Sequence, residues 1–174
     1  LYDLMRVRGF WGGYYVDALA GVDIALWDLF GKRAGLPLSA LLGGRRHDTI
    51  PAYVSGLPKA TLQERCDLAV EWTRKGFRGI KFAAAMSDDG VAREMAALRE
   101  AVGPGIDLMV DLHWKYGAAE AIRLIRRLEA HDLYFAEAPC APEDLEGQAR
   151  VAAAIGAPLA LGEELRTVFE YRPR

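Results

Sequence analysis

Three short apolar runs, each ending in a carboxylate, decide the fold of this chain: IDLMVD at residues 106–111, LYFAE at 133–137 and PLALGE at 158–163. The terminal acids are Asp111, Glu137 and Glu163, and both intervals between them are 26 residues. Each interval also holds one amphipathic helical pattern, which predicts three successive strand–helix units with an acid at the same place in each. Parallel strands of an α/β barrel point the same way, so their carboxyl ends meet at one mouth.

Three carboxylates at one mouth repel one another unless a cation lies between them. A ligand set made only of oxygen atoms favours a hard ion, Mg²⁺ first and Mn²⁺ or Ca²⁺ next. The alternative is three solvated acids at strand-to-helix turns, where helix dipoles also favour negative charge. The equal spacing favours the metal site, with Asp111, Glu137 and Glu163 as the predicted ligands.

The composition is that of an ordinary globular protein, with 52% hydrophobic and 26% charged residues in a chain of 174. The net charge is −2 and no run of lysine or arginine is present, which argues against nucleic-acid and membrane partners. No apolar run approaches the roughly 18 residues that a membrane helix needs. Cys66 and Cys140 are too far apart for a C-x-x-C site, so we predict free thiols in a reducing, cytoplasmic compartment.

Helical patterns precede the strands. Residues 1–16 combine glycine with aromatic and basic side chains and predict a loop. Apolar residues recur at helical spacing over 17–34, and Gly35 followed by Pro37 predicts the end of that helix. A second, short helix is predicted over 38–42.

From residue 50 onward, strand and helix patterns alternate, with predicted strands centred on Tyr53, Ile80, Met109, Phe135 and Leu159. Thr61 and Glu64 suit a capping box at the start of the helix after the first strand. Asp88 or Asp89 can cap the next helix, and Pro142 suits the first position of the helix before the last strand. Strands that alternate with helices of about 10–15 residues predict parallel βαβ units.

Two architectures fit this alternation, a barrel and an open doubly wound sheet. No G-x-G-x-x-G pattern follows the first strand and no P-loop is present, so a nucleotide-binding sheet lacks its usual signal. Acids on three consecutive strands also suit a barrel mouth better than a flat sheet. We therefore predict an α/β fold, a partial (β/α) TIM-type barrel of about five βα units. Because eight units need about 200–250 residues, we expect the chain to be part of a longer protein.

Two further residues are candidates for catalysis. Lys81 follows the second strand in the run GIKF, so its ammonium group is expected at the same mouth, where it can stabilise negative charge. The alternative is a surface lysine at a strand end. His113 lies two residues after Asp111, and period-two alternation places both side chains on one face of the strand or its extension. An imidazole titrates near neutral pH and suits proton delivery to a leaving group, whereas the alternative is a histidine packed beside Trp114.

Together these residues resemble the enolase superfamily, in its mandelate racemase/muconate lactonizing branch, and most of all its acid-sugar dehydratases. GVDIALWDL at 21–29 and the segment 35–44 resemble the stretch between that family's capping domain and its barrel. Asp111, Glu137 in Glu-Ala-Pro and Glu163 in Gly-Glu match its three magnesium ligands. The resemblance implies that residues 1–48 are the end of an N-terminal capping domain with linker helices. It implies that 49–174 are the first part of a barrel catalytic domain.

The pattern Asp111-x-His113 resembles that of galactonate- and mannonate-type dehydratases, in which this histidine is the general acid. Many members carry Lys-x-Lys on the second strand, with the second lysine as a base. Lys81-Phe82-Ala83 keeps only the first lysine, which argues against a two-base racemase that uses this position. The family's other base is expected beyond Arg174.

The resemblance implies a Mg²⁺-dependent lyase that dehydrates a sugar acid. Its α-proton is removed to give a metal-stabilised enediolate, and the β-hydroxyl then leaves. Lys81 adds positive charge at the substrate carboxylate, and His113 protonates the leaving hydroxyl. The expected partner is a small-molecule sugar acid, and we expect a homo-oligomer for the full-length enzyme. The alternatives are a racemase or epimerase of the same superfamily and a non-catalytic, truncated barrel remnant with unpaired sheet edges. For these 174 residues alone we expect no activity.

Overall fold

The computed structural model describes residues 13–87 and 90–173. The chain divides into two compact units, one of residues 13–50 with 165–170 and the other of 51–164 with 171–173. Most of the loop predicted over 1–16 lies outside the described residues, as do the candidate caps Asp88 and Asp89.

Two helices form most of the first unit, α2 (Tyr14–Ala34) and α3 (Leu38–Leu41). Helix α2 begins three residues before the predicted position and ends as predicted, because Gly35 takes the left-handed conformation with φ 65°. Near the end of the chain Arg166 donates from Nε to Asp17 Oδ1 at 2.6 Å, and the short helix α8 (Val168–Tyr171) follows.

The second unit contains a five-stranded parallel sheet in the order β1-β2-β3-β4-β5, as the alternating patterns predict. Its strands are β1 (Val54–Ser55), β2 (Gly79–Ala83), β3 (Asp107–Asp111), β4 (Leu133–Glu137) and β5 (Leu159–Ala160). Neighbours in sequence are neighbours in the sheet, so all five carboxyl ends lie on the same edge.

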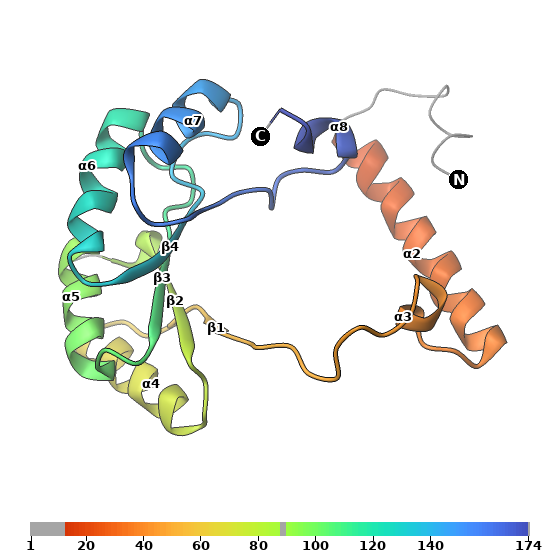
Figure 1. The fold of residues 1–174 in the computed structure, drawn as a ribbon, viewed down its shortest axis with the longest axis horizontal. Coiled ribbons are helices and arrows are strands. Elements are labelled where there is room, and N and C mark those ends of the chain that lie inside the picture. The colour runs from red at the N-terminus through yellow and green to blue at the C-terminus, as the bar shows by residue number, and fades with distance from the viewer. Residues whose placement is uncertain (1–12, 88–89, 174) are drawn as a thin grey trace. The chain divides into compact units, whose positions relative to one another are not determined.

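Helices connect successive strands and lie along one side of the sheet (Figure 1). They are α4 (Leu62–Arg74), α5 (Val91–Val102), α6 (Ala118–Glu129) and α7 (Leu145–Ala154), with a 3₁₀ turn, η1, at Ala84–Met86. Within the described residues no helix is long and apolar enough to span a membrane.

The predicted capping box at the start of α4 is confirmed. The Glu64 amide donates to Thr61 Oγ1 at 3.3 Å, and the Thr61 amide donates to Glu64 Oε2 at 2.9 Å. The prediction for Pro142 is wrong, because α7 begins at Leu145 and is capped by Asp144. Asp144 Oδ1 accepts a hydrogen bond from the Gly147 amide, a free donor of the first turn, at 2.8 Å. A proline side chain has no oxygen that could accept this bond.

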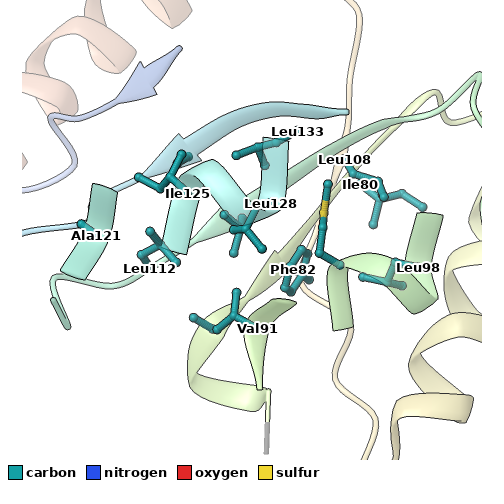
Figure 2. Packing of buried hydrophobic residues seen from close by; sticks show 14 of the residues in the cluster. Ile80, Phe82, Val91, Leu98, Leu108, Leu112, Ala121, Ile125, Leu128 and Leu133 are labelled. Atoms are coloured by element: carbon teal, nitrogen blue, oxygen red, sulfur yellow. The ribbon is translucent and has the colours of Figure 1, made fainter. Parts of the chain in front are cut away.

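The hydrophobic core lies between the sheet and its helices. Figure 2 shows Ile80 and Phe82 of β2 with Leu108 of β3 packed among side chains of α5 and α6, including Leu98, Ile125 and Leu128. All six side chains are almost completely buried. Because strand side chains alternate, Lys81, Met109 and Asp111 belong to the opposite face of the sheet.

That opposite face is concave. The rings of Tyr53, beside β1, and Phe135, on β4, meet edge to face with centroids 6.2 Å apart. Three strand-to-strand steps of about 4.8 Å would separate their backbones by about 14 Å in a flat sheet. The contact therefore reflects a sheet that curves as a barrel wall does.

Candidate active site at the carboxyl ends of the strands

Asp111 and Glu137 are the last residues of neighbouring strands and are register partners. Their backbone positions are therefore at the same depth, at the edge where the carboxyl ends of the strands meet. Leu108, Val110 and Ala136 face the helices, so both acids project from the concave face. Two carboxylates side by side in this position form a concentrated negative charge that favours a cation.

Glu163 does not lie at that depth. The partner of Glu137 in β5 is Ala160, the last residue of the strand, and Glu163 lies three positions further along, with an exposed side chain between half-buried neighbours. Equal spacing in sequence therefore does not give equal register. In residues 13–87 and 90–173, no three His, Cys, Asp or Glu side chains cluster at metal-binding distance. The donor chemistry of Asp111 and Glu137 fits a hard cation, and the ligand role of Glu163 stays a prediction.

Lys81 is the central residue of β2 rather than the residue after its end. Its ammonium group forms an ion pair with Glu137 Oε2, reaching over β3 on the concave face. The two side chains are only 11% and 15% exposed. The same ammonium lies 5.7 Å from the centre of the Tyr53 ring. The structure therefore brings two of the predicted site residues into direct contact.

Several groups set the proton affinity of Lys81. Burial lowers the pKa of its amine, but the hydrogen bond and charge of Glu137, with smaller effects of Tyr53 and Asp111, outweigh burial and raise the pKa overall. Lys81 therefore stays a cation at neutral pH and acts as a positive charge, not as a base.

His113 lies beside Asp111, but not for the reason that strand alternation gives. Strand β3 ends at Asp111, and His113 is in a turn with φ 50°. Its backbone amide donates to Asp111 Oδ1 at 2.9 Å, which orients the carboxylate. The exposed imidazole stacks at an angle on Trp114, with ring centroids 4.9 Å apart. The backbone amide, and not the imidazole, therefore makes the contact with Asp111, while the ring lies in solvent beside Trp114.

Left-handed backbone conformations follow both acids. His113 and Trp114 come after Asp111 with φ 50° and 57°, and Ala138 comes after Glu137 with φ 46°. The Trp114 amide donates to the Ala138 carbonyl at 2.6 Å, which ties the two turns together. Side chains with a Cβ adopt this conformation at a cost, and such residues gather at functional sites. Nothing in their residue types signals this geometry in the sequence.

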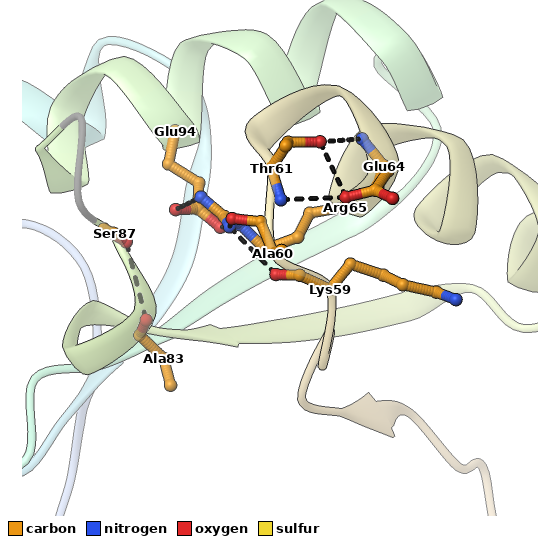
Figure 3. Close-up of polar contacts among 8 residues, drawn as sticks. All are labelled: Lys59, Ala60, Thr61, Glu64, Arg65, Ala83, Ser87 and Glu94. Atoms are coloured by element: carbon orange, nitrogen blue, oxygen red, sulfur yellow. Dashed lines mark hydrogen bonds and ion pairs between the residues drawn. The ribbon is translucent and has the colours of Figure 1, made fainter.

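A buried ion pair that the sequence did not predict joins α4 to α5 and to the loop after β1. Figure 3 shows the guanidinium of Arg65, in the first turn of α4, between Glu94 of α5 and the loop that follows β1. It donates to both Glu94 oxygens at 2.8 and 3.1 Å, and to the carbonyls of Lys59 and Ala60 at 3.1 Å. Arg65 lies four residues before the buried Ala69, on the apolar stripe of α4, and that position was the available signal.

Comparison with known proteins identifies two family models that match the chain. The family described as "Enolase C-terminal domain-like" matches residues 64–173. The family described as "Mandelate racemase / muconate lactonizing enzyme, N-terminal domain" matches residues 3–43.

Among curated relatives, a 3,6-anhydro-alpha-L-galactonate cycloisomerase of Streptomyces coelicolor is 40% identical over 92% of this chain and 45% of its own length. A D-galactonate dehydratase of Xanthomonas oryzae pv. oryzae is 36% identical over 99% of this chain and 48% of its own. Among solved structures, a racemase of S. coelicolor with bound magnesium has a TM-score of 0.85 and 36% identity, over 93% of this chain and 46% of that one. The chain thus spans about half the length of the relatives it matches.

The sheet, its outer helices and these neighbours define part of a (β/α) barrel of the TIM type. The chain belongs to the enolase superfamily, in its mandelate racemase/muconate lactonizing enzyme branch.

Proposed function

We propose that the full-length protein is a Mg²⁺-dependent lyase that dehydrates a sugar acid. One observation carries this proposal: Asp111 and Glu137 end neighbouring strands at the same depth, with the Lys81 cation and His113 directly beside them. The dehydratase relative and the magnesium-bound racemase neighbour support it. The buried free thiols of Cys66 and Cys140 suit a reducing compartment, and we propose a cytoplasmic enzyme.

Asp111 and Glu137 would hold the metal, and Glu163 is the proposed third ligand. Bound Mg²⁺ would supply positive charge that stabilises the negative charge on a substrate carboxylate as the neighbouring carbon loses its proton. The hydrogen bond from the His113 amide fixes the orientation of Asp111, which lowers the entropy cost of gathering ligands.

Lys81 and His113 would act on the substrate directly. Lys81 presents a cation on the concave face and favours a substrate that carries a carboxylate. His113 would hold a proton on its imidazole and transfer it to the β-hydroxyl group, which then leaves as water. In this assignment Lys81 binds the substrate carboxylate and His113 donates a proton to the leaving hydroxyl. Neither residue therefore needs to be the base that takes the α-proton.

A second candidate is an isomerase, which removes the α-proton but releases no water. The 40% identical cycloisomerase and the racemase neighbour favour it. The lone Lys81, followed by Phe82 and Ala83 rather than by a second lysine, argues against a two-base racemase at this strand.

Product analysis separates the two. The full-length protein would be incubated with a panel of sugar acids and Mg²⁺, and the products identified by mass spectrometry and NMR. A keto-deoxy acid, lighter by one water, supports dehydration. A product of unchanged mass supports the isomerase.

Variants test the residue roles. Asp111→Asn should weaken Mg²⁺ binding measured by calorimetry, whereas Asp107→Asn, at the opposite end of β3, should not. Equal affinity of Asp111→Asn and wild type would remove Asp111 from the ligand set. His113→Asn should stop water loss and can still permit α-proton exchange in D₂O. Full dehydration by that variant would exclude His113 as the acid.

A further inference from the structure

We propose that Lys81 is a resident cation that competes with the divalent metal for Glu137, so that metal binding releases Lys81 toward the substrate. The inference rests on the proposed metal site and adds an order of events to it. In the structure Lys81 pairs with Glu137, the carboxylate that the metal would also use. Once displaced, its ammonium group becomes available to an incoming carboxylate.

The contact between Lys81 and Glu137 is built into the fold. Lys81 is in the middle of β2 and Glu137 at the end of β4, so each side chain leans over β3 on the concave face to make the pair. Both side chains are largely shielded from water, and the Tyr53 ring covers the ammonium from the β1 side. Such a pair is stronger than an exposed one, since solvent screens it less.

Charge then sets the metal and the lysine in competition at Glu137. Asp111 and Glu137 place two negative charges at one depth, and Lys81 offsets one of them. Asp111 and Glu137 would hold the divalent ion, which brings a second cation to the carboxylate that Lys81 already pairs with. Repulsion between like charges is strong where water is largely excluded. This repulsion weakens the Lys81–Glu137 pair when an ion binds, and the weakening is the competition that we propose.

Calorimetry of Mg²⁺ binding by the full-length protein tests the competition. Lys81→Met removes the charge and keeps most of the side-chain volume, so it should bind Mg²⁺ about tenfold more tightly than wild type, a value between those of exposed and buried ion pairs. Lys115→Met is the matched control, because Lys115 is an exposed lysine after β3 that contacts the Tyr116 ring instead. Its affinity should equal that of wild type.

Equal or weaker Mg²⁺ binding by Lys81→Met would overturn the competition and leave the metal site standing. Absence of Mg²⁺ binding by wild type would overturn both the metal site and the competition.

A second measurement needs no variant and so does not depend on Lys81→Met folding. Amine-reactive labelling of wild type, followed by mass spectrometry, reports how accessible each lysine is. Lys81 should react slowly in a chelator and at least about threefold faster when Mg²⁺ saturates the site, the change expected for loss of a modest ion pair. Lys75, which pairs with Glu71 on the surface of α4, should label at the same rate in both conditions. An unchanged or slower rate at Lys81 with Mg²⁺ would overturn the proposal.

Discussion

Replacing Arg65 by methionine removes one partner of an ion pair that is almost completely shielded from water. Arg65 and Glu94 are 3% and 1% exposed and meet through two parallel hydrogen bonds of 2.8 and 3.1 Å. The guanidinium also holds the carbonyls of Lys59 and Ala60 (Figure 3). The substitution therefore leaves a buried carboxylate without its cation and two carbonyls without that donor.

The expected cost follows from the burial of the charge that remains. Breaking a buried pair by removing one partner costs about 3–5 kcal/mol, because the remaining charge has lost both water and its counter-ion. Replacing both partners by apolar side chains of similar size leaves no unpaired charge. The double variant Arg65→Met with Glu94→Met should therefore be more stable than Arg65→Met alone, although it lacks more polar contacts.

Urea unfolding of the full-length protein, followed by circular dichroism, measures these differences. The exposed pair Lys75–Glu71, with side chains 50% and 56% exposed, is the control, and Lys75→Met should cost no more than about 0.5 kcal/mol. A loss below about 1 kcal/mol for Arg65→Met would contradict the argument. So would a double variant that loses as much stability as the two single variants together.

Two smaller perturbations test the local structure around the same sheet. Thr61→Ala should lower the unfolding free energy by about 1 kcal/mol, because the first turn of α4 loses its cap. Hydrogen bonds from the Thr61 side chain and backbone lower the pKa of Glu64, so its stabilisation is present above the ordinary glutamate pKa and is lost as pH falls through the depressed one. The stability difference between wild type and Glu64→Ala should accordingly shrink in acid urea titrations, and a constant difference would contradict the capping box. Gly79→Ala should cost about 1–3 kcal/mol, since a Cβ there would lie 2.7 Å from Met109 Cε and 2.9 Å from Tyr53 Cβ. Gly105→Ala, with no atom within 4 Å of its Cβ, should be neutral in the same assay, and equal losses would argue against the close packing on the concave face.

The sheet could be predicted from sequence because its central strands are short apolar runs bounded by turn residues. The runs around Ile80, Met109 and Phe135 are apolar and bounded by turn residues, and all three form strands. The first residue of α7 was less predictable. Pro142 and Asp144 both suit a helix start, and only the chain path after β4 decides that Asp144 caps the helix.

Side-chain partners across the fold could not be predicted, since they depend on how far each chain segment is from another in space. Lys81 was expected at the same edge as the acids, yet its contact with Glu137 depends on two side chains that lean toward each other across β3. Arg65 and Glu94 are 29 residues apart, and their pairing depends on how α4 packs against α5. Charge alone does not tell such a pair from two solvated side chains.

The three acids show most directly what spacing does and does not determine. Asp111 and Glu137 are each the last residue of a strand, and the two strands are paired up to these residues. The 26 residues from one acid to the other therefore bring the chain back to the same depth in the sheet. The next 26 residues do not, because β5 is short and its ladder with β4 ends at Ala160. Beyond Ala160 the backbone leaves the sheet, and in the part of the chain that the structure describes the strand ladder does not reach Glu163. Position in the ladder, rather than position in the sequence, therefore makes Asp111 and Glu137 a pair, and the strands do not dictate the placement of Glu163.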